Sequence, residues 1–270
     1  MELHLQGKVA LVTGGGQGVG RRICLELAGE GVKVVINDYF LERAQAVQKE
    51  IETAGGQALA VQADIGDSEQ VERMFAAARE RFGDVDILVN NAGVTVARRT
   101  KGGMPPTFME MPVEDWKEVV DLNVYGVMNC CHSALPGMQR KGGGKIVNIM
   151  SEAGRVGEAR LAVYSGAKAA MLGFAKAIAQ EHGRDCINVN TIALGAVSRE
   201  GIANGPLHPS STPETDDRLK KMLGAYPIAR GLGRLSRPED ISGVVAFLAS
   251  DRAAFITGQS LGVSGGYVML

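Results

Sequence analysis

Residues 8–20 read KVALVTGGGQGVG, an apolar run of strand length that passes directly into a glycine-rich loop. Glycines let a chain turn tightly and approach a pyrophosphate, whose charge is favoured by the N-terminus of the following helix. The common G-x-G-x-x-G spacing is absent, because Gly14, Gly18 and Gly20 give T-G-x-x-x-G-x-G. A flexible strand–helix turn is the alternative, but a loop after the first strand of an alternating chain favours phosphate binding.

The alternation of strand and helix patterns continues along the chain. Apolar runs predict buried strands over Lys8–Thr13, Val32–Asn37, Gln57–Gln62, Asp86–Asn90, Lys145–Met150, Ile187–Ile192 and Gln259–Val263. Amphipathic patterns predict helices over Gly18–Gly29, Leu41–Ala54, Ser68–Phe82, Val113–Met138, Ala162–His182 and Arg237–Ala249. This order is typical of an α/β fold with a doubly wound parallel sheet, here of about seven strands with helices on both faces. Ligands of such sheets bind at the carboxyl ends of the strands.

Composition narrows the function classes. A length of 270 residues suits a single α/β domain, predicted over residues 1–270. The net charge of −1 gives no reason to expect a nucleic-acid partner. The four cysteines and four histidines have neither metal-ligand nor disulfide spacing, so no metal is predicted. Without a signal-peptide pattern or an apolar run of membrane-spanning length, a cytoplasmic protein with no membrane partner is expected.

Acidic residues end the second and third predicted strands. Asp38 follows Gly20 by eighteen residues, near the distance at which an acid meets an adenosine ribose. A carboxylate accepts from both ribose hydroxyls but repels a 2′-phosphate, so Asp38 favours NAD over NADP as cofactor. A solvated acid is the alternative reading of Asp38. Asp64 could accept from the adenine amino group, or it could belong to the cap of the helix that begins near Asp67.

Two further motifs bear on the site. The run Asn90-Asn91-Ala92-Gly93 ends the fourth strand, where asparagine side chains can brace strand ends and small residues leave room for a cofactor; a simple turn is the alternative. Tyr164 and Lys168 are four residues apart, which places them on one helical face. An ammonium beside a phenol favours the phenolate and makes the tyrosine a usable acid or base. Most such pairs, taken alone, are a half-buried ring beside a solvated amine.

Taken together, these motifs resemble those of the short-chain dehydrogenase/reductase family over nearly the whole chain. The resemblance rests on T-G-x-x-x-G-x-G, N-N-A-G, Asn123, Ser151 thirteen residues before Tyr164, and Y-x-x-x-K. It implies a Rossmann-like fold of the compact single-domain type. It also implies an NAD(P)-dependent oxidoreductase, usually a homotetramer, that acts on a small-molecule secondary alcohol or ketone.

The resemblance also implies roles for individual residues. Tyr164 would exchange the proton with the substrate oxygen, and Lys168 would lower its pKa and bind the nicotinamide ribose. Ser151 would hydrogen-bond the substrate oxygen, and Asn123 would hold a water in a proton relay; a capping Ser151 and a helix-interior Asn123 are the alternatives. The residues expected to bind the cofactor are Gly14, Gln17, Gly18, Val19, Gly20, Asp38, Asp64, Ile65, Asn91, Ala92, Gly93, Tyr164, Lys168 and Val197.

The chain departs from the family pattern after the sixth strand, where Leu194-Gly195 replaces the usual Pro-Gly. Without the proline we expect a looser turn, which affects the expected contact of Val197 with the nicotinamide carboxamide. The long polar segment 196–227 is predicted to be a mobile loop that covers the substrate. The loop 98–106 carries Arg99 and Lys101, which could meet an anionic tail such as a coenzyme A phosphate, although a solvated loop is the simpler reading.

The sequence therefore favours an NAD-dependent short-chain alcohol dehydrogenase or ketoreductase. Apolar Val156, Leu161 and Met104 suggest a hydrophobic or alicyclic substrate, and an acyl thioester is a further candidate. One rival is an NADPH-dependent 3-oxoacyl-(acyl-carrier-protein) reductase, against which Asp38 argues. The rival from another class is a catalytically silent nucleotide-binding scaffold subunit, which would have no need of Ser151, Tyr164 and Lys168.

Overall fold

The computed structural model of the protein describes residues 2–93, 105–198, 207–208 and 210–269. Its centre is a seven-stranded parallel sheet with the strand order β3-β2-β1-β4-β5-β6-β7. The predicted doubly wound α/β architecture is confirmed. The strands are β1 (Val9–Val12), β2 (Lys33–Asp38), β3 (Gln57–Gln62), β4 (Ile87–Asn90), β5 (Gly144–Ser151), β6 (Ile187–Leu194) and β7 (Ser260–Val263).

Strand β1 lies at the point where the strand order reverses. Ala10 pairs with Val34 of β2 on one side and with Ile87 of β4 on the other. The connections that follow β1 and β4 therefore leave the sheet in opposite directions. The crevice between them, at the carboxyl ends of the strands, is where sheets of this topology bind ligands.

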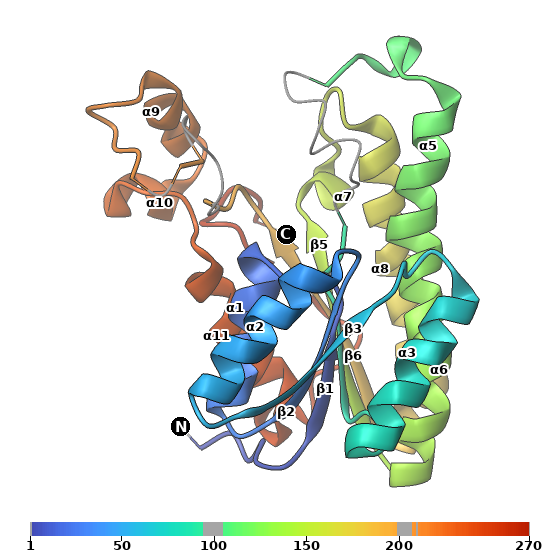
Figure 1. The fold of residues 1–270 in the computed structure, drawn as a ribbon. Coiled ribbons are helices and arrows are strands. Elements are labelled where there is room, and N and C mark those ends of the chain that lie inside the picture. Colours follow the sequence, from blue (N-terminus) through green and yellow to red (C-terminus); the bar gives the residue numbers. More distant parts are fainter. Residues whose placement is uncertain (1, 94–104, 199–206, 209, 270) are drawn as a thin grey trace.

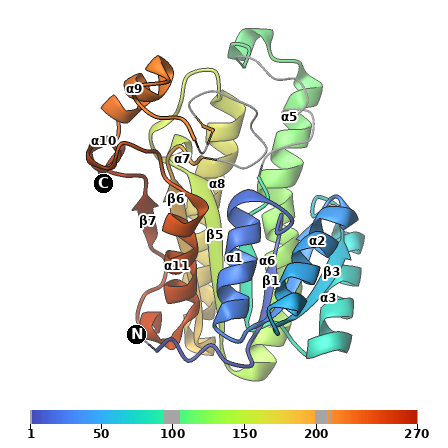
Figure 2. The same ribbon diagram turned by 60° about the vertical axis from the view of Figure 1, so that its left-hand side comes forward.

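Two layers of helices cover the sheet (Figures 1 and 2). Alternate residues of β1 point to opposite faces: Ala10 and Val12 join one apolar cluster, and Val9 and Leu11 join the other. Because both faces are buried, the strands read as continuous apolar runs. One layer contains α1 (Gly18–Gly29), α2 (Leu41–Thr53) and α11 (Pro238–Ala249), and the other contains α3 (Ser68–Phe82), α6 (Gly126–Lys141) and α8 (Ala162–His182).

The helix predicted over Val113–Met138 is divided into three parts. Helix α5 (Val113–Val120) is followed by a π-helical turn, η2 (Asp121–Tyr125), and then by α6. Such turns occur often at functional sites. Here the turn places Asn123 in the interior with no exposed surface, and its Nδ2 donates to the Val119 carbonyl at 3.0 Å.

The described part of segment 196–227 contains one short helix, α9, and ends where a second, α10, begins; both lie at the carboxyl edge of the sheet, across from α5 (Figure 1). Helices α9 (Asp217–Gly224) and α10 (Pro227–Leu232) share a small apolar cluster of their own. Asp216 caps α9 by accepting from the backbone N–H groups of Arg218 and Leu219. We call the described residues 207–208 and 210–232 the flap.

The shorter elements are η1 (Phe108–Glu110), α7 (Ala153–Val156), η3 (Gly183–Asp185) and η4 (Asp251–Ala253). No helix within the described ranges has both the length and the apolar character needed to cross a membrane. Arg99, Lys101 and Met104 lie outside the described residues. The expectations for these three side chains therefore stay predictions.

Candidate active site

A cleft of about 1250 Å³ runs along the carboxyl ends of the strands. It brings together residues from the glycine loop, from the ends of β2 to β6 and from the flap. The predicted residues that line it are Gly14, Gln17, Gly18, Val19, Gly20, Asp38, Asp64, Ile65, Asn91, Ala92, Gly93, Ser151, Tyr164, Lys168 and Val197. Asn123 lies behind the wall of the cleft. Neither Val156 nor Leu161 lines it, and its apolar wall near the flap comes from Leu207 and Met222.

The glycine loop lets helix α1 begin against the end of β1. A Cβ on Gly20 would lie 2.1 Å from the Gly14 carbonyl oxygen, so any side chain there would force the loop and the helix apart. Gly14 itself has a φ of +61°, which favours glycine. Gln17 gives the N-terminus of α1 no side-chain cap, the arrangement in which a phosphate can take the place of the cap.

Asp38 is held in a fixed orientation at the far end of the cleft. It is 5% exposed, and its two carboxylate oxygens accept from the backbone N–H groups of Gly16 and Phe40, each at 3.1 Å. Each oxygen can accept a further hydrogen bond. Arg43, which was not predicted from the sequence, also lines this end, and its guanidinium lies 4.2 Å from the centre of the Phe40 ring. Its only sequence signal is a cation five residues after Asp38.

The two acids after β3 have separate structural roles. Asp67 caps α3, because its Oδ1 accepts from the backbone N–H groups of Glu69 and Gln70. Asp64 instead lines the cleft, and its Oδ1 accepts from the Gly66 N–H at 2.9 Å. The helix cap considered for Asp64 is therefore provided by Asp67.

Asn91 and Thr13 join the ends of β1 and β4. The Nδ2 of Asn91 donates to the carbonyl oxygens of Thr13 and Gly14 at 3.0 and 3.1 Å. The Thr13 hydroxyl accepts from the backbone N–H groups of Asn91 and Ala92. Asn90 donates to Asn148 on β5 at 2.9 Å. The asparagines brace the strand ends as expected, and Thr13 is a partner that the sequence analysis did not identify.

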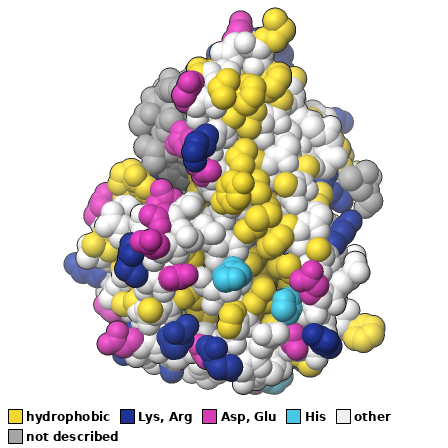
Figure 3. Space-filling view, turned by 90° about the vertical axis from the view of Figure 1, so that its right-hand side faces the viewer, with side chains coloured by type: hydrophobic (Ala, Val, Ile, Leu, Met, Phe, Trp, Pro, Cys, Tyr) yellow, Lys and Arg dark blue, Asp and Glu magenta, His cyan; other side chains and the backbone are white. Residues whose placement is uncertain are grey.

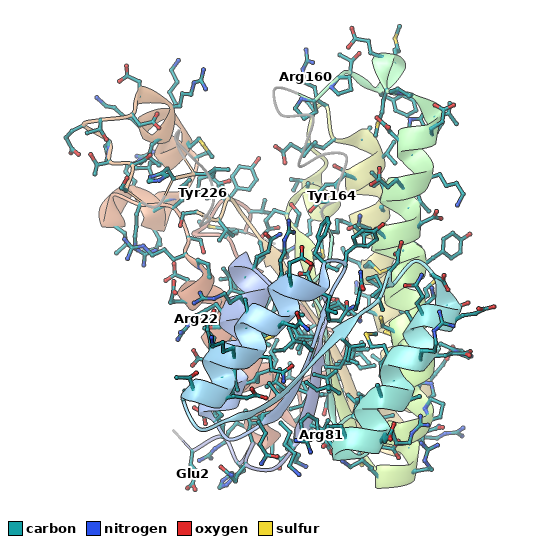
Figure 4. All side chains as sticks on the ribbon, in the orientation of Figure 1. Glu2, Arg22, Arg81, Arg160, Tyr164 and Tyr226 are labelled. Atoms are coloured by element: carbon teal, nitrogen blue, oxygen red, sulfur yellow. The ribbon has the colours of Figure 1, made fainter. Side chains whose placement is uncertain are left out.

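Ser151, Tyr164 and Lys168 meet at the other end of the cleft, where Tyr164 is labelled in Figure 4. The Ser151 hydroxyl accepts from the Ala153 N–H at 3.2 Å, so this serine supports the turn into α7 as well as lining the cleft. Lys168 is 4% exposed and donates to the Ile149 carbonyl at 3.2 Å. Its Nζ lies 5.7 Å from the centre of the Tyr164 ring. The structure thus brings the three side chains together in the wall of one cleft.

Gly93 allows Lys168 and Asn123 to approach each other behind this end of the cleft. A Cβ on Gly93 would lie 2.7 Å from the lysine Nζ and 3.0 Å from the asparagine Oδ1. Among the described residues, that Oδ1 is a buried acceptor without a protein donor. Buried acceptors are normally satisfied by protein or by ordered water. The geometry is therefore compatible with a water held by Asn123.

Burial lowers the pKa of the Lys168 ammonium from its ordinary value of 10.5 to about 8. Between these two values the unfolded chain binds more protons than the folded one, so this group makes the free energy of unfolding rise as the pH rises from about 8 toward 10.5. We expect urea unfolding to show a weaker rise over this range for Lys168→Met than for the unchanged protein at the same protein concentration. Identical pH dependence of the two proteins would contradict a desolvated ammonium at this position.

A match to a protein-family model identifies the family, and it agrees with the geometry of this cleft. The family model described as short chain dehydrogenase matches residues 8–204. The chain belongs to the short-chain dehydrogenase family. As a short-chain dehydrogenase it is an oxidoreductase with a nucleotide-cofactor cleft, and the family resemblance noted in the sequence is confirmed.

Individual relatives of this short-chain dehydrogenase match it over almost their whole length. It is 38% identical to a 3-oxoacyl-(acyl-carrier-protein) reductase of Staphylococcus aureus over 264 residues, which cover 97% of this chain and 98% of that protein. It is also 38% identical to the reductase of that name from Synechocystis over 269 residues, 98% of each chain. A solved 7α-hydroxysteroid dehydrogenase, complexed with NADH and 7-oxo-glycochenodeoxycholic acid, is 36% identical and superposes with a TM-score of 0.84 over 98% of this chain and 96% of that one.

Proposed function

We propose that this enzyme transfers a hydride between NAD(H) and a secondary alcohol or ketone. The observation that carries the cofactor choice is Asp38, whose carboxylate is buried, oriented by two backbone N–H groups and placed in the wall of the cleft. A 2′-phosphate placed there would meet a fixed negative charge, whereas ribose hydroxyls would find acceptors. The structural relative that contains NADH supports the same choice.

Different residues of the chain carry out different parts of the proton transfer. When bound, the nicotinamide dinucleotide supplies the hydride chemistry. In the oxidising direction the alcohol loses a hydride from carbon and a proton from oxygen, and Tyr164 takes that proton. Ser151 donates a hydrogen bond to the same oxygen, because the charge that develops there needs a donor in a dry site. Lys168 holds a positive charge near the Tyr164 ring, which favours the phenolate. Asn123 holds a water that continues the proton path from Lys168.

Asp38→Ala tests the cofactor assignment. A contact between like charges costs several kcal/mol, so we expect the unchanged enzyme to prefer NAD(H) over NADP(H) by on the order of 100-fold in kcat/KM. The variant should narrow or reverse this preference, because Arg43 then faces the 2′-phosphate without a competing carboxylate. The matched control is the double variant Asp38→Ala/Arg43→Gln, which should accept NADP(H) less well than the single variant. Equal kcat/KM for NAD(H) and NADP(H) in the unchanged enzyme would contradict the assignment of NAD(H) as the cofactor.

An NADPH-dependent 3-oxoacyl-(acyl-carrier-protein) reductase is the second candidate, and the names of the two sequence relatives favour it. Oxidation or reduction of both cofactors with a panel of acyl thioesters, alicyclic ketones and hydroxysteroids would distinguish the candidates. Apolar Leu207 and Met222 in the cleft wall suit the apolar part of any of these substrates. A catalytically silent scaffold subunit would bind nucleotide but turn over none of the panel.

The proposed assembly is a homotetramer. Segment 196–227 is proposed to cover the substrate in each subunit; its residues 199–206 and 209 lie outside the described part of the chain. Figure 3 shows an apolar band along the face that carries α5 and α6. Exposed Val113 lies on α5, exposed Tyr125 ends the π-helical turn η2, and half-buried Met128 and Leu135 lie on α6. Contiguous exposed apolar surface of this kind marks protein–protein contacts. Light scattering of the purified protein tests the assembly, and a monomer at micromolar concentration would exclude it.

A further inference from the structure

Tyr226, in the flap between α9 and α10, reaches the turn that follows β6. Its hydroxyl accepts a hydrogen bond from the Ala196 N–H at 3.2 Å. A Cβ on Gly195 would lie 2.7 Å from the Cε1 of the same ring, so the ring rests directly on the glycine backbone. Figure 4 shows Tyr226 on the flap side and Tyr164 on the α8 side of the same edge of the sheet.

Tyr226 is itself held by the C-terminal residues. Its ring stacks on that of Tyr267, with the centres 4.9 Å apart and the planes at 21°. The N–H of Ile228, in the first turn of α10, donates to the Gly265 carbonyl at 3.1 Å. Tyr226, like Met222, also packs against the apolar cluster that contains the buried Leu223. A movement of the flap must therefore either carry Tyr226 with it or break these contacts.

The turn after β6 is attached at both of its ends to the chain that follows it. Tyr226 holds Ala196 at the start, and the N–H and hydroxyl of Ser198 both donate to the Ser236 carbonyl, at 2.8 and 3.1 Å. Gly195, Ala196 and Val197 line the cleft between these two attachments. The turn lacks the proline that would restrict its backbone, and the Tyr226 contacts supply a restraint instead.

We propose that Tyr226 is a positioning residue that couples the flap to the turn lining the nicotinamide end of the cofactor cleft. The proposal rests on the proposed function, because it takes a nicotinamide dinucleotide as the ligand of the cleft. While the Tyr226 hydroxyl is bonded to the Ala196 N–H and its ring rests on Gly195, the turn 195–197 and the flap form one unit. A ligand that orders the turn then also orders the flap, and a dinucleotide without the nicotinamide does not.

The first test needs no ligand. Tyr226→Phe keeps the ring on Gly195 and removes the acceptor of the Ala196 N–H. A neutral hydrogen bond of ordinary strength predicts that hydrogen exchange of peptides covering 195–198 rises about two- to tenfold in this variant. Tyr267→Phe, which keeps the ring stack and leaves the Ala196 contact in place, is the matched control and should exchange as the unchanged protein does. Unchanged exchange in Tyr226→Phe would overturn the proposed attachment.

The second test compares NADH with ADP-ribose, which lacks the nicotinamide. In the unchanged protein we expect NADH to protect both 195–198 and α9, and ADP-ribose to protect neither. In Tyr226→Phe the Kd for NADH should rise about two- to tenfold, with the Kd for ADP-ribose unchanged and the protection of α9 lost. Gly195→Ala adds a methyl group that would push the Tyr226 ring away from the turn. It should likewise raise the Kd for NADH, leave the Kd for ADP-ribose unchanged and abolish the protection of α9.

The outcomes separate the two proposals. If the unchanged protein binds neither nucleotide, the proposed function fails, and the exchange measured without ligand still decides whether Tyr226 holds the turn. If the unchanged protein binds both NADH and ADP-ribose, and Tyr226→Phe either weakens the binding of both nucleotides equally or weakens neither, the proposed cofactor stands. In that case the proposed coupling of the flap to the turn is wrong. Protection of α9 by NADH that survives in both variants would also overturn the coupling.

Discussion

Tyr164→Phe should bind NADH as the unchanged enzyme does and lose about 10²- to 10⁴-fold in kcat, the usual contribution of a positioned acid or base. The phenyl ring keeps its place in the cleft wall and its packing, so the loss comes from the missing proton donor alone. Fluorescence titration with NADH and steady-state turnover of the same preparation measure the two quantities. The loss should appear in both directions of the reaction.

The control for Tyr164→Phe is Tyr125→Phe, which removes a phenol that is 54% exposed and does not line the cleft. We expect it to retain normal turnover. A folded Tyr164→Phe preparation that keeps a tenth or more of the activity would show that the proton moves by another route. Loss of NADH binding along with turnover would show that Tyr164 acts through cofactor affinity.

Arg155→Met should lower the free energy of unfolding by about 3–5 kcal/mol, because it leaves a buried carboxylate without its partner. Glu152, directly after Ser151, is 1% exposed, and its carboxylate lies 3.2 Å from the Arg155 guanidinium, which is 9% exposed. The pair lies against β7, where a Cβ on Gly262 would be 3.0 Å from Glu152 and 3.2 Å from Arg155. Chemical denaturation at a fixed protein concentration measures the loss.

The double variant Glu152→Gln/Arg155→Met distinguishes lost charge pairing from lost packing. It removes the buried charge, so we expect it to recover most of the stability that Arg155→Met loses. A single variant that loses less than about 1 kcal/mol, the worth of an exposed pair, would contradict a desolvated pair at this position.

Where local pattern decides structure, the sequence prediction was correct. The bounds of β3 (Gln57–Gln62) and α8 (Ala162–His182) match those predicted, because an apolar run of strand length and helical periodicity are local signals. The π-helical turn at Asp121–Tyr125 was missed, because the apolar spacing runs through it without a break. The short α10 was missed as well, since its single buried residue, Ala229, gives no periodicity.

The residues of the candidate site also differ in whether a local pattern in the sequence predicts them. The glycine loop and the Tyr164–Lys168 pair could be predicted because each depends on a spacing within one turn or one helix. Asp38 could be predicted because it ends the strand that follows the glycine loop and its helix. Arg43 could not, because its position depends on the absence of a side chain at Gly16, whose Cβ would lie 2.6 Å from the Cβ of Arg43. The contact of Tyr226 with Ala196 spans 30 residues and leaves no local signature. The NAD preference, the tetramer and the cytoplasmic location stay predictions.

The π-helical turn also sets the rotational phase of everything that follows it. One residue added to an α-helix turns the downstream part by about 100° around its axis. Helix α6 places Val127, Cys130, Cys131, Ala134 and Met138 against the sheet, and only this phase does so while Asn123 points inward. Deleting a single residue between Asp121 and Tyr125 would thus turn the buried side of α6 away from the sheet. The number of residues in this segment is therefore as tightly constrained as the identity of Asn123 within it.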